Sequence, residues 1–240
     1  MTTEGKKAAR VGIIVTSADK LGDHATGLWL EECATPYYIF SDEGCEVSIL
    51  SPLGGAVPID AGSLAGDFYT TEAKKFKEED EKAWDTLQNS TKLDPATVVA
   101  DFDALFFCGG HGTATDFISN GGEKTNPALV VEAMVAAKKL VGLVCHGPIV
   151  LAECTTTDGK PLMEGVLCTG FSNTEEVAVG LAEKVPYLLQ SRLKEQGANY
   201  EKGNDWEAHA VRDKETNIIT GQNPQSSEAT ARLLLSVLGE

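Results

Sequence analysis

The chain has 240 residues, 42% of them hydrophobic, and no repeat or linker rich in Pro, Gly or Ser divides it. This length and composition predict one globular domain over residues 1–240, with a sizeable core. The chain carries 20 basic and 36 acidic residues, a formal net charge of −16. Because phosphate binding depends on lysine and arginine, the charge argues against nucleic acid and anionic membranes as partners.

The cysteines and the first residues indicate a compartment. Residues 1–10 are polar and basic, and the apolar run Val11–Val15 is too short for a signal-peptide core or a membrane span. The six cysteines lie far apart and form no Cys-x-x-Cys pair, so neither a zinc site nor a disulfide framework is expected. The sequence therefore predicts a cytoplasmic protein with reduced thiols.

Short apolar runs alternate with helical patterns along the chain, as in β-α-β units. The predicted strands are Val11–Val15, Val47–Leu50, Leu105–Cys108, Val141–Val144, Val166–Thr169 and Ile218–Thr220. The predicted helices are Gly27–Phe40, Ala73–Asn89, Pro127–Lys139, Pro148–Glu153, Thr174–Gln196 and Ser227–Leu238. Pro36 should kink or end the first helix. This order predicts an α/β fold with a doubly wound parallel sheet flanked by helices.

One segment, Asp60–Thr97, does not fit the alternation. It holds a charged helix, Glu72–Lys82, with aromatic residues interspersed: Phe68, Tyr69, Phe76 and Trp84. We expect a small helical cap insertion around residues 60–97 that packs beside the site and is not sheet scaffold. Ordinary core packing is the other explanation for its aromatic residues. Dinucleotide and nucleotide sites are not expected, because no Gly-x-Gly-x-x-Gly follows Val15 and no P-loop motif occurs.

Cys145 stands where the apolar run Val141–Val144 must turn sharply into a helix. Gly147 permits a tight backbone there, and Pro148 suits a first helical turn. Such an elbow projects the thiol from the carboxyl end of the sheet, where the positive end of the helix dipole should lower the thiol pKa. We therefore predict that Cys145 is a nucleophile, although cysteine is more often a small buried residue.

The loop Cys108–Gly112 also follows a predicted strand, so it should reach the same edge of the sheet. Its glycines let backbone amides approach a reacting atom, and the amides of Gly110 and His146 could together hold an oxyanion. His111 lies between these glycines and is a candidate substrate-binding residue. No cluster of histidine, cysteine and carboxylate residues has metal-ligand spacing, so no metal is expected.

Two glutamate doublets are candidates for acid–base chemistry. Glu31–Glu32 lies in a predicted helix, where adjacent side chains point about 100° apart, so one carboxylate should face inward. Glu175–Glu176 could supply an acid that orients His146 and completes a Cys/His/acid arrangement. Glutamates are more often solvated surface charges than catalytic groups, which is the alternative for both doublets.

Several motifs in this order together resemble the ThiJ/PfpI superfamily, which has a class I glutamine amidotransferase-like, flavodoxin-like fold. They are Val144–Pro148, Gly109–Gly112, Glu32-x-x-x-Pro36 and Thr220–Pro224. The chain most resembles the branch of stress-induced chaperones and glyoxalase III proteins, through Ser51–Asp60 and Thr169–Phe171. The match spans nearly the whole chain.

The resemblance implies roles for particular residues. The family's nucleophile falls on Cys145 and its histidine on His146. The carboxylate that hydrogen-bonds the thiol falls on Glu32, and the triad acid on Glu176, with a one-residue ambiguity in each doublet. The resemblance also implies a homodimer and no cofactor.

The implied activity is that of glyoxalase III, a cofactor-independent lyase that converts methylglyoxal and water to D-lactate without glutathione. The substrate is then a small aldehyde such as methylglyoxal or glyoxal. The Cys145 thiolate would form a hemithioacetal, and a base, His146 or Glu32, would move a proton to the neighbouring carbon. Hydrolysis of the resulting lactoyl thioester would release the product.

Other functions would use the same residues differently. A protein or nucleotide deglycase, or a cysteine hydrolase acting on peptides or amides, needs a more open cleft for its substrate. A holdase chaperone would bind unfolded clients through exposed apolar patches and would keep its activity in Cys145→Ala. A redox stress sensor would oxidise an exposed Cys145.

Overall fold

In a computed structural model, which describes residues 8–119 and 121–239, a seven-stranded sheet organises the chain. The strand order is β10 (Ala210–Arg212), β11 (Ile218–Gly221), β7 (Leu140–Val144), β6 (Ala104–Phe107), β1 (Arg10–Ile14), β4 (Glu46–Ser51) and β5 (Thr91–Lys92). All neighbours pair in parallel except β10 and β11. The predicted doubly wound sheet is confirmed, with one antiparallel edge strand.

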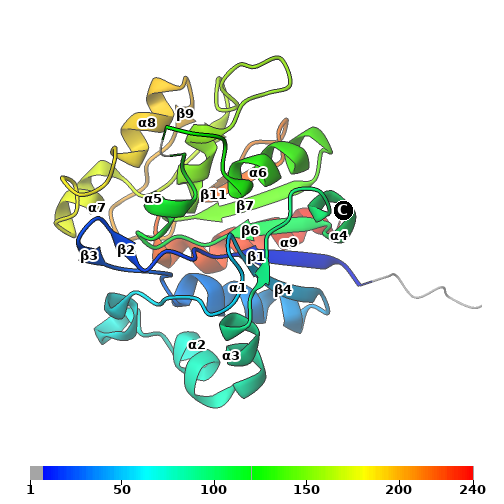
Figure 1. Cartoon of the computed structure of the whole chain (residues 1–240), viewed down its shortest axis with the longest axis vertical. Helices are drawn as coiled ribbons and strands as arrows, with labels where there is room; N and C mark the ends of the chain where they lie inside the picture. Colours follow the sequence, from blue (N-terminus) through cyan, green and yellow to red (C-terminus); the bar gives the residue numbers. More distant parts are fainter. Residues whose placement is uncertain (1–7, 120, 240) are drawn as a thin grey trace, which may run out of the picture.

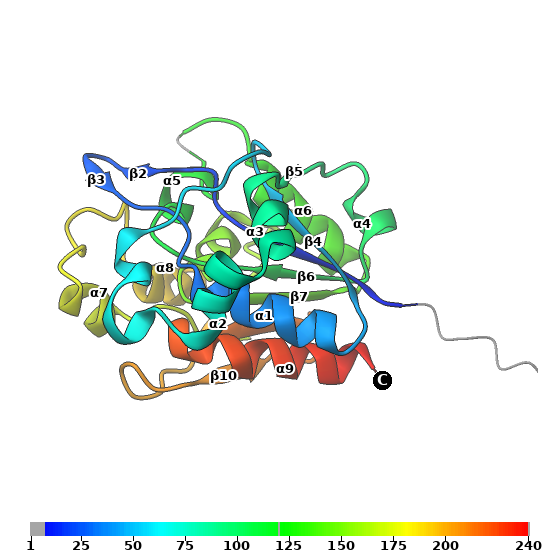
Figure 2. The same cartoon turned by 90° about the horizontal axis from the view of Figure 1, so that it is seen from below.

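Helices cover both faces of the sheet, as Figures 1 and 2 show. Helices α1 (Glu31–Asp42) and α9 (Ser227–Leu238) pack together on one face, and α6 (Asn126–Ala136) lies on the other. Strands β6 and β7 are buried along their whole length. Because both faces are covered, their sequences are continuous apolar runs without polar alternation.

The remaining short elements lie around this core. Strand β2 (Lys20–Leu21) forms a hairpin with β3 (His24–Ala25), and β8 (Leu167–Cys168) pairs in parallel with β9 (Asn199–Tyr200). Further short elements include α4 (Val98–Asp101), α5 (Thr113–Asp116), η4 (Gly147–Glu153) and η5 (Pro224–Ser226).

Five of the six predicted strands belong to the main sheet. The sixth, Val166–Thr169, forms β8, which pairs with β9 outside that sheet. The sequence did not predict the edge strands β5 and β10, because two or three residues are too few to show a periodic pattern.

Helix α1 begins at Glu31, later than predicted, and it continues through Pro36 to Asp42. The expectation that Pro36 could end the helix there is therefore wrong. Proline has no N–H to donate to the carbonyl four residues earlier, which belongs to Glu32. The Cys108 thiol donates to this carbonyl instead, at 3.1 Å. A side chain from the end of β6 thus satisfies the group that proline leaves unpaired.

Two long predicted helices are broken. Ala73–Asn89 divides into α2 (Thr71–Lys74), η3 (Lys75–Glu79) and α3 (Glu81–Gln88), because the Asp80 carboxylate caps a new helix by accepting from the Ala83 amide at 3.0 Å. Thr174–Gln196 divides into α7 (Asn173–Ala178) and α8 (Leu189–Glu195). The interruption contains Gly180, with φ of 75°, and Pro186.

The segment 60–97 contains η1 (Ala61–Leu64), η2 (Gly66–Phe68), α2, η3, α3 and β5. Because β5 pairs with β4, the expectation that this segment is not sheet scaffold is wrong at its end. Its aromatic residues lie in two different places: some belong to the core, and others lie near the candidate site described below. Phe76 is fully buried against Tyr37, with ring centroids 5.2 Å apart, whereas Phe68 packs edge-on against Trp29 at 5.0 Å. The role of the segment as a cap stays a prediction.

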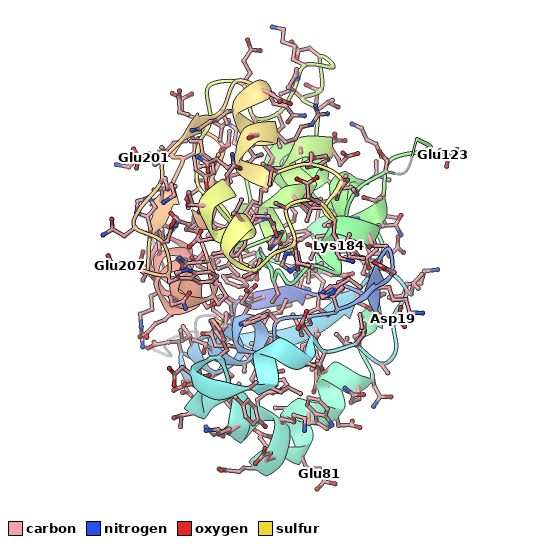
Figure 3. All side chains as sticks on the ribbon, turned by 90° about the vertical axis from the view of Figure 1, so that its left-hand side faces the viewer. Asp19, Glu81, Glu123, Lys184, Glu201 and Glu207 are labelled. Carbon is pink, nitrogen blue, oxygen red and sulfur yellow. The ribbon has the colours of Figure 1, made fainter. Side chains whose placement is uncertain are left out.

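The surface carries the acidic charge, and Figure 3 shows labelled side chains such as Glu81, Glu201 and Glu207 around the ribbon. All six cysteines are free thiols. Among the described residues, no helix combines the length and apolar character that crossing a membrane requires.

Replacing Phe106 by alanine tests the packing of the core. Its ring is fully buried and lies 5.8 Å from that of Phe40. We expect Phe106→Ala to lower the free energy of unfolding by about 3–5 kcal/mol, measured by chemical denaturation. Leu53→Ala, at a side chain 74% exposed, is the control and should change it by less than about 0.5 kcal/mol. Equal effects of the two substitutions would contradict this packing.

Candidate active site

Cys145 follows β7 in a strained backbone conformation, with φ of 58°. Its amide donates to the Gly221 carbonyl at 3.0 Å, and its carbonyl accepts from the Phe171 amide at 2.9 Å. The chain then turns into η4 at Gly147, where a Cβ atom would lie 2.6 Å from the Phe107 carbonyl. Hydrogen bonds and close packing therefore hold the predicted elbow at the carboxyl edge of the sheet.

The environment of the Cys145 thiol differs from the prediction. The residue is only 4% exposed. Burial raises its pKa well above the ordinary value of 9.0, and a hydrogen bond from the His146 amide opposes this shift. The expectation of a pKa lowered by a helix dipole is therefore wrong, because η4 is a short 3-10 helix and desolvation dominates. The resting group is a thiol.

A chain of contacts leads from this thiol to Glu176. The Sγ atom lies 3.6 Å from His146 Nδ1, and His146 Nε2 lies 2.7 Å from Glu176 Oε2. The other oxygen, Oε1, lies 2.8 Å from His111 Nε2. Glu176 is in the first turn of α7, which Ser172 caps in a capping box. One carboxylate thus holds both histidines.

The protonation of this cluster follows from Glu176. Burial opposes its negative charge, but the two histidines outweigh burial and lower its pKa below the ordinary 4.5. An ionised carboxylate only accepts hydrogen bonds, so the Nε2 atoms of His111 and His146 must each carry the proton. In the neutral rings, each Nδ1 is then left as an acceptor.

Glu32 approaches Cys145 from the first turn of α1. Its Oε2 accepts a hydrogen bond from the Gly109 amide at 2.6 Å. Burial and the neighbouring Glu31 raise the pKa of Glu32 well above 4.5, while a hydrogen bond with Cys145 and the Gly109 amide oppose them less. The raised pKa favours the neutral carboxyl group, which can donate its proton in a hydrogen bond to sulfur.

The first glutamate of each doublet points elsewhere. Glu31 accepts from Ser227 Oγ at 2.9 Å, and burial raises its pKa to about 7. Glu175 accepts from the Trp206 amide at 2.9 Å and from Asn223 Nδ2 at 2.8 Å. Glu31 thus joins α1 to α9, and Glu175 fixes the loop that carries Trp206. Only the second member of each doublet contacts the Cys145 cluster.

Two amides beside Cys145 are available to an oxyanion. Gly110 adopts a φ of 90° and packs so closely that a Cβ atom would lie 2.2 Å from the Gly27 carbonyl. In the described part of the chain, the Gly110 and His146 amides donate to no oxygen acceptor. The His146 amide interacts with the thiol itself. Both residues line the cavity in front of Cys145.

This cavity is small, with a volume of about 60 Å³. Because one water needs about 10–15 Å³ on this measure, it has room for about four to six water-sized groups. Its lining residues are Trp29, Phe68, Gly110, His111, Cys145, His146, Phe171, Val179, Trp206 and Pro224. The sequence analysis did not identify Trp29 or Phe171 as site residues, because isolated aromatic residues look the same in a core. Neither residue lies in a motif with recognisable chemistry.

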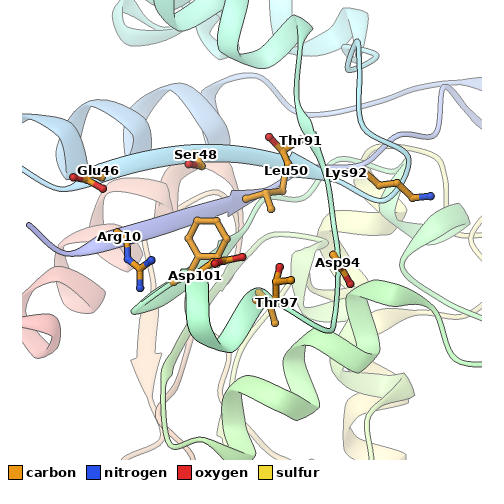
Figure 4. A pocket seen from close by; sticks show the side chains of 11 residues that line it. Arg10, Glu46, Ser48, Leu50, Thr91, Lys92, Asp94, Thr97 and Asp101 are labelled. Carbon is orange, nitrogen blue, oxygen red and sulfur yellow. The ribbon is translucent and has the colours of Figure 1, made fainter.

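A larger cavity of about 260 Å³ lies over β1 and β4 (Figure 4). Both basic and acidic side chains line it, among them Arg10, Lys92, Asp94 and Asp101. Its lining contains no cysteine or histidine. The small cavity at Cys145 combines a cysteine with two histidines, so it is the candidate active site.

His111, His146 and Glu176 form the one group in residues 8–119 and 121–239 whose composition could hold a metal ion, with ligand atoms within 4.8 Å of one another. A histidine ligand must present a ring lone pair to the metal. Here each Nε2 instead presents its hydrogen to Glu176. The group fits a hydrogen-bonded network better than a metal centre, and the expected absence of a metal stays a prediction.

Alkylation of Cys145 tests the state of its thiol. Because burial raises the thiol pKa, we expect the rate of modification by iodoacetamide to keep increasing up to pH 9. The rate is measured by mass spectrometry of the peptide that contains Cys145, with Cys145→Ala as the control for the other cysteines. A rate that is already constant above pH 7 would show a preformed thiolate and contradict this geometry.

Glu31 should make the stability depend on pH. Folding raises its pKa from 4.5 to about 7, so its favourable contribution is complete below pH 4.5 and is lost as the pH rises through 7. Relative to Glu31→Gln, the wild type should therefore lose roughly 2–3 kcal/mol of unfolding free energy between pH 5 and pH 8. Denaturation at both pH values measures this, with exposed Glu201→Gln as control. A constant difference between wild type and Glu31→Gln would refute the assignment.

Comparison with known proteins identifies the family of this chain. No family model matches the chain. Glyoxalase 3 of Candida albicans is 31% identical over 216 residues, which cover 86% of this chain and 87% of the relative. A glutathione-independent glyoxalase of Saccharomyces cerevisiae is also 31% identical, over 86% of each chain. The crystal structure of Candida albicans glyoxalase III superposes with a TM-score of 0.82 at 26% identity, covering 95% of this chain and 96% of that one. The chain belongs to the glutathione-independent glyoxalase family, whose members include glyoxalase III.

Proposed function

We propose that the protein is a glutathione-independent glyoxalase that converts methylglyoxal and water to D-lactate, with Cys145 as its nucleophile. One observation carries the proposal: the thiol lies 3.6 Å from His146 Nδ1 and faces a cavity of about 60 Å³. Methylglyoxal has five non-hydrogen atoms, which is the size this cavity admits. The activity named for the relatives supports the same assignment.

The first step is addition of the thiol to the aldehyde carbon, C1. His146 Nδ1 takes the proton from Sγ as the sulfur–carbon bond forms, so no thiolate has to persist in a buried site. The electron pair of the carbonyl moves to its oxygen, which the Gly110 and His146 amides stabilise. The protonated Glu32 carboxyl donates a hydrogen bond to the sulfur.

The hemithioacetal then isomerises. The hydrogen on C1 moves as a proton to C2, through an enediol-like state, and C1 becomes the carbonyl carbon of a lactoyl thioester. Water attacks this carbon with His146 as base, and the thiol leaves with a proton. The net reaction adds one water to methylglyoxal and requires no oxidant or reductant.

The cavity favours this function over the alternatives from the sequence. A deglycase or a peptidase must accept a side chain or a backbone attached to a macromolecule, and the aromatic wall leaves about 60 Å³. A redox sensor relies on an accessible, acidic thiol, whereas Cys145 is 4% exposed and its pKa is raised. A chaperone function independent of Cys145 is compatible with this site and is separated from it by Cys145→Ala.

We further propose that the protein works in the cytoplasm as a homodimer. The six free cysteines support a reducing compartment. The dimer rests on the family resemblance, and light scattering of the purified protein would detect it.

Lactate formation tests the proposed activity. Metal-free protein incubated with methylglyoxal without glutathione should form D-lactate, detected with a stereospecific lactate dehydrogenase. We expect no lactate from Cys145→Ala and at least ~100-fold lower kcat for Glu176→Gln, whose amide cannot accept from both imidazoles.

The matched surface control is Glu201→Gln, which makes the same change at an exposed glutamate and should retain full activity. Lactate formation by Cys145→Ala at the wild-type rate would overturn the role of the thiol, and no lactate from the wild type would overturn the proposed activity.

A further inference from the structure

The isomerisation step of the proposed reaction, on which this inference rests, needs two acid–base groups at once. A base must remove the proton from C1 while an acid gives a proton to the ketone oxygen on C2. One group cannot hold both protonation states. The site must therefore place a neutral base beside a protonated acid.

Two of the titratable side chains near sulfur are already protonated at this stage. His146 holds the proton that it took from Cys145. Burial raises the pKa of Glu32 and favours its protonated form, which is a poor base, and its Oε2 already accepts from the Gly109 amide at 2.6 Å. The sequence alone made both residues candidates for the base, and these contacts favour a third group.

We propose that Nδ1 of His111 is the general base that carries the proton from C1 to C2, while His146 is the acid toward oxygen. The His111 ring lines the cavity with Cys145, and its centroid lies 4.1 Å from that of His146. Its Nε2 is occupied by Glu176 at 2.8 Å. Its Nδ1 has no hydrogen-bond partner among the described residues and is not sealed by protein atoms.

The charges around His111 keep it neutral when His146 is protonated. Burial lowers the pKa of His111, and the charge of His146 lowers it further. Glu176 from α7 and Asp60, before η1, oppose this shift less strongly. Because the two rings share one carboxylate, protonating His146 disfavours a second proton on His111. The pair thus supplies one acid and one base.

The bonds and charges balance. His111 Nδ1 takes the C1 proton, the C1–H electron pair becomes the C1–C2 double bond, and the ketone oxygen receives the proton of His146. His111 then returns its proton to C2, and the oxyanion on C1 re-forms a carbonyl as the lactoyl thioester. Both histidines end neutral. Transfer by one fixed ring also delivers the proton to one face of C2.

The variant that tests this role is His111→Gln. Glutamine places an amide N–H near the former Nε2 position, so it can still donate to Glu176, but it has no basic nitrogen. We expect a fall in kcat of at least ~100-fold. Alkylation of Cys145 by iodoacetamide should stay within threefold of wild type, and the deuterium isotope effect on kcat with methylglyoxal deuterated at C1 should increase. His24→Gln, outside the cavity lining, should keep wild-type kcat.

The outcomes separate a general base from a positioning residue. Activity of His111→Gln within threefold of wild type would overturn the proposal. A parallel loss of kcat and Cys145 alkylation would also overturn it, because His111 would then act only by positioning Glu176 and His146. If circular dichroism shows that His111→Gln is unfolded, His111→Ala replaces it: recovery of activity with added imidazole supports the base, and no recovery contradicts it. An inactive wild type would instead refute the proposed function itself.

Discussion

The carboxylate of Glu176, shared between two imidazole rings, is the interaction on which the chemistry of this site depends. Each of its oxygens accepts one ring N–H, at 2.7 and 2.8 Å. This fixes the tautomers of His111 and His146 and leaves a bare Nδ1 on each. One of these faces the thiol, which can therefore lose its proton during attack. The capping box of α7 keeps Glu176 in place because it orders the first helical turn.

The site also shows how a fold keeps four glutamates buried in two adjacent pairs. Glu176 is stabilised as an anion by two imidazoles, whereas Glu31 and Glu32 have raised pKa values that favour their neutral forms. Glu175 satisfies its oxygens with neutral donors, including the Trp206 amide. Burying a charge without partners is unfavourable, so each carboxylate either finds donors or keeps its proton. Similar residues thus have different roles because their neighbours differ.

Sequence reasoning predicted the features that local patterns determine. Continuous apolar runs identified the central strands, and the Gly147–Pro148 turn located the elbow at Cys145. It failed where contacts between residues distant in the sequence determine where a helix ends or begins. The side chain of Cys108 satisfies the carbonyl that Pro36 leaves unpaired, so α1 continues, and Asp80 starts a new helix inside a predicted one. Desolvation reversed the expected shift of the thiol pKa, because burial cannot be read from a motif.

The lining of the cavity was the least predictable part. Trp29, Phe171 and Trp206 come from distant parts of the chain, and only the folded sheet brings their rings together. His111 was predicted as a substrate-binding residue, but nothing in Gly110–Gly112 reveals that Glu176 reaches its imidazole. The doublets could not be resolved from sequence either, because neighbouring residues in a helix differ only by their direction.

The most direct test of this account is the tautomeric state of the two histidines, measured by nitrogen-15 NMR on protein labelled at histidine. The chain has four histidines, and His24→Gln and His209→Gln leave only the signals of the site. In their neutral forms, we expect both remaining rings to carry hydrogen on Nε2, with an unprotonated Nδ1. Hydrogen on Nδ1 of either ring, or two doubly protonated rings, would contradict the shared carboxylate as the organiser of this site.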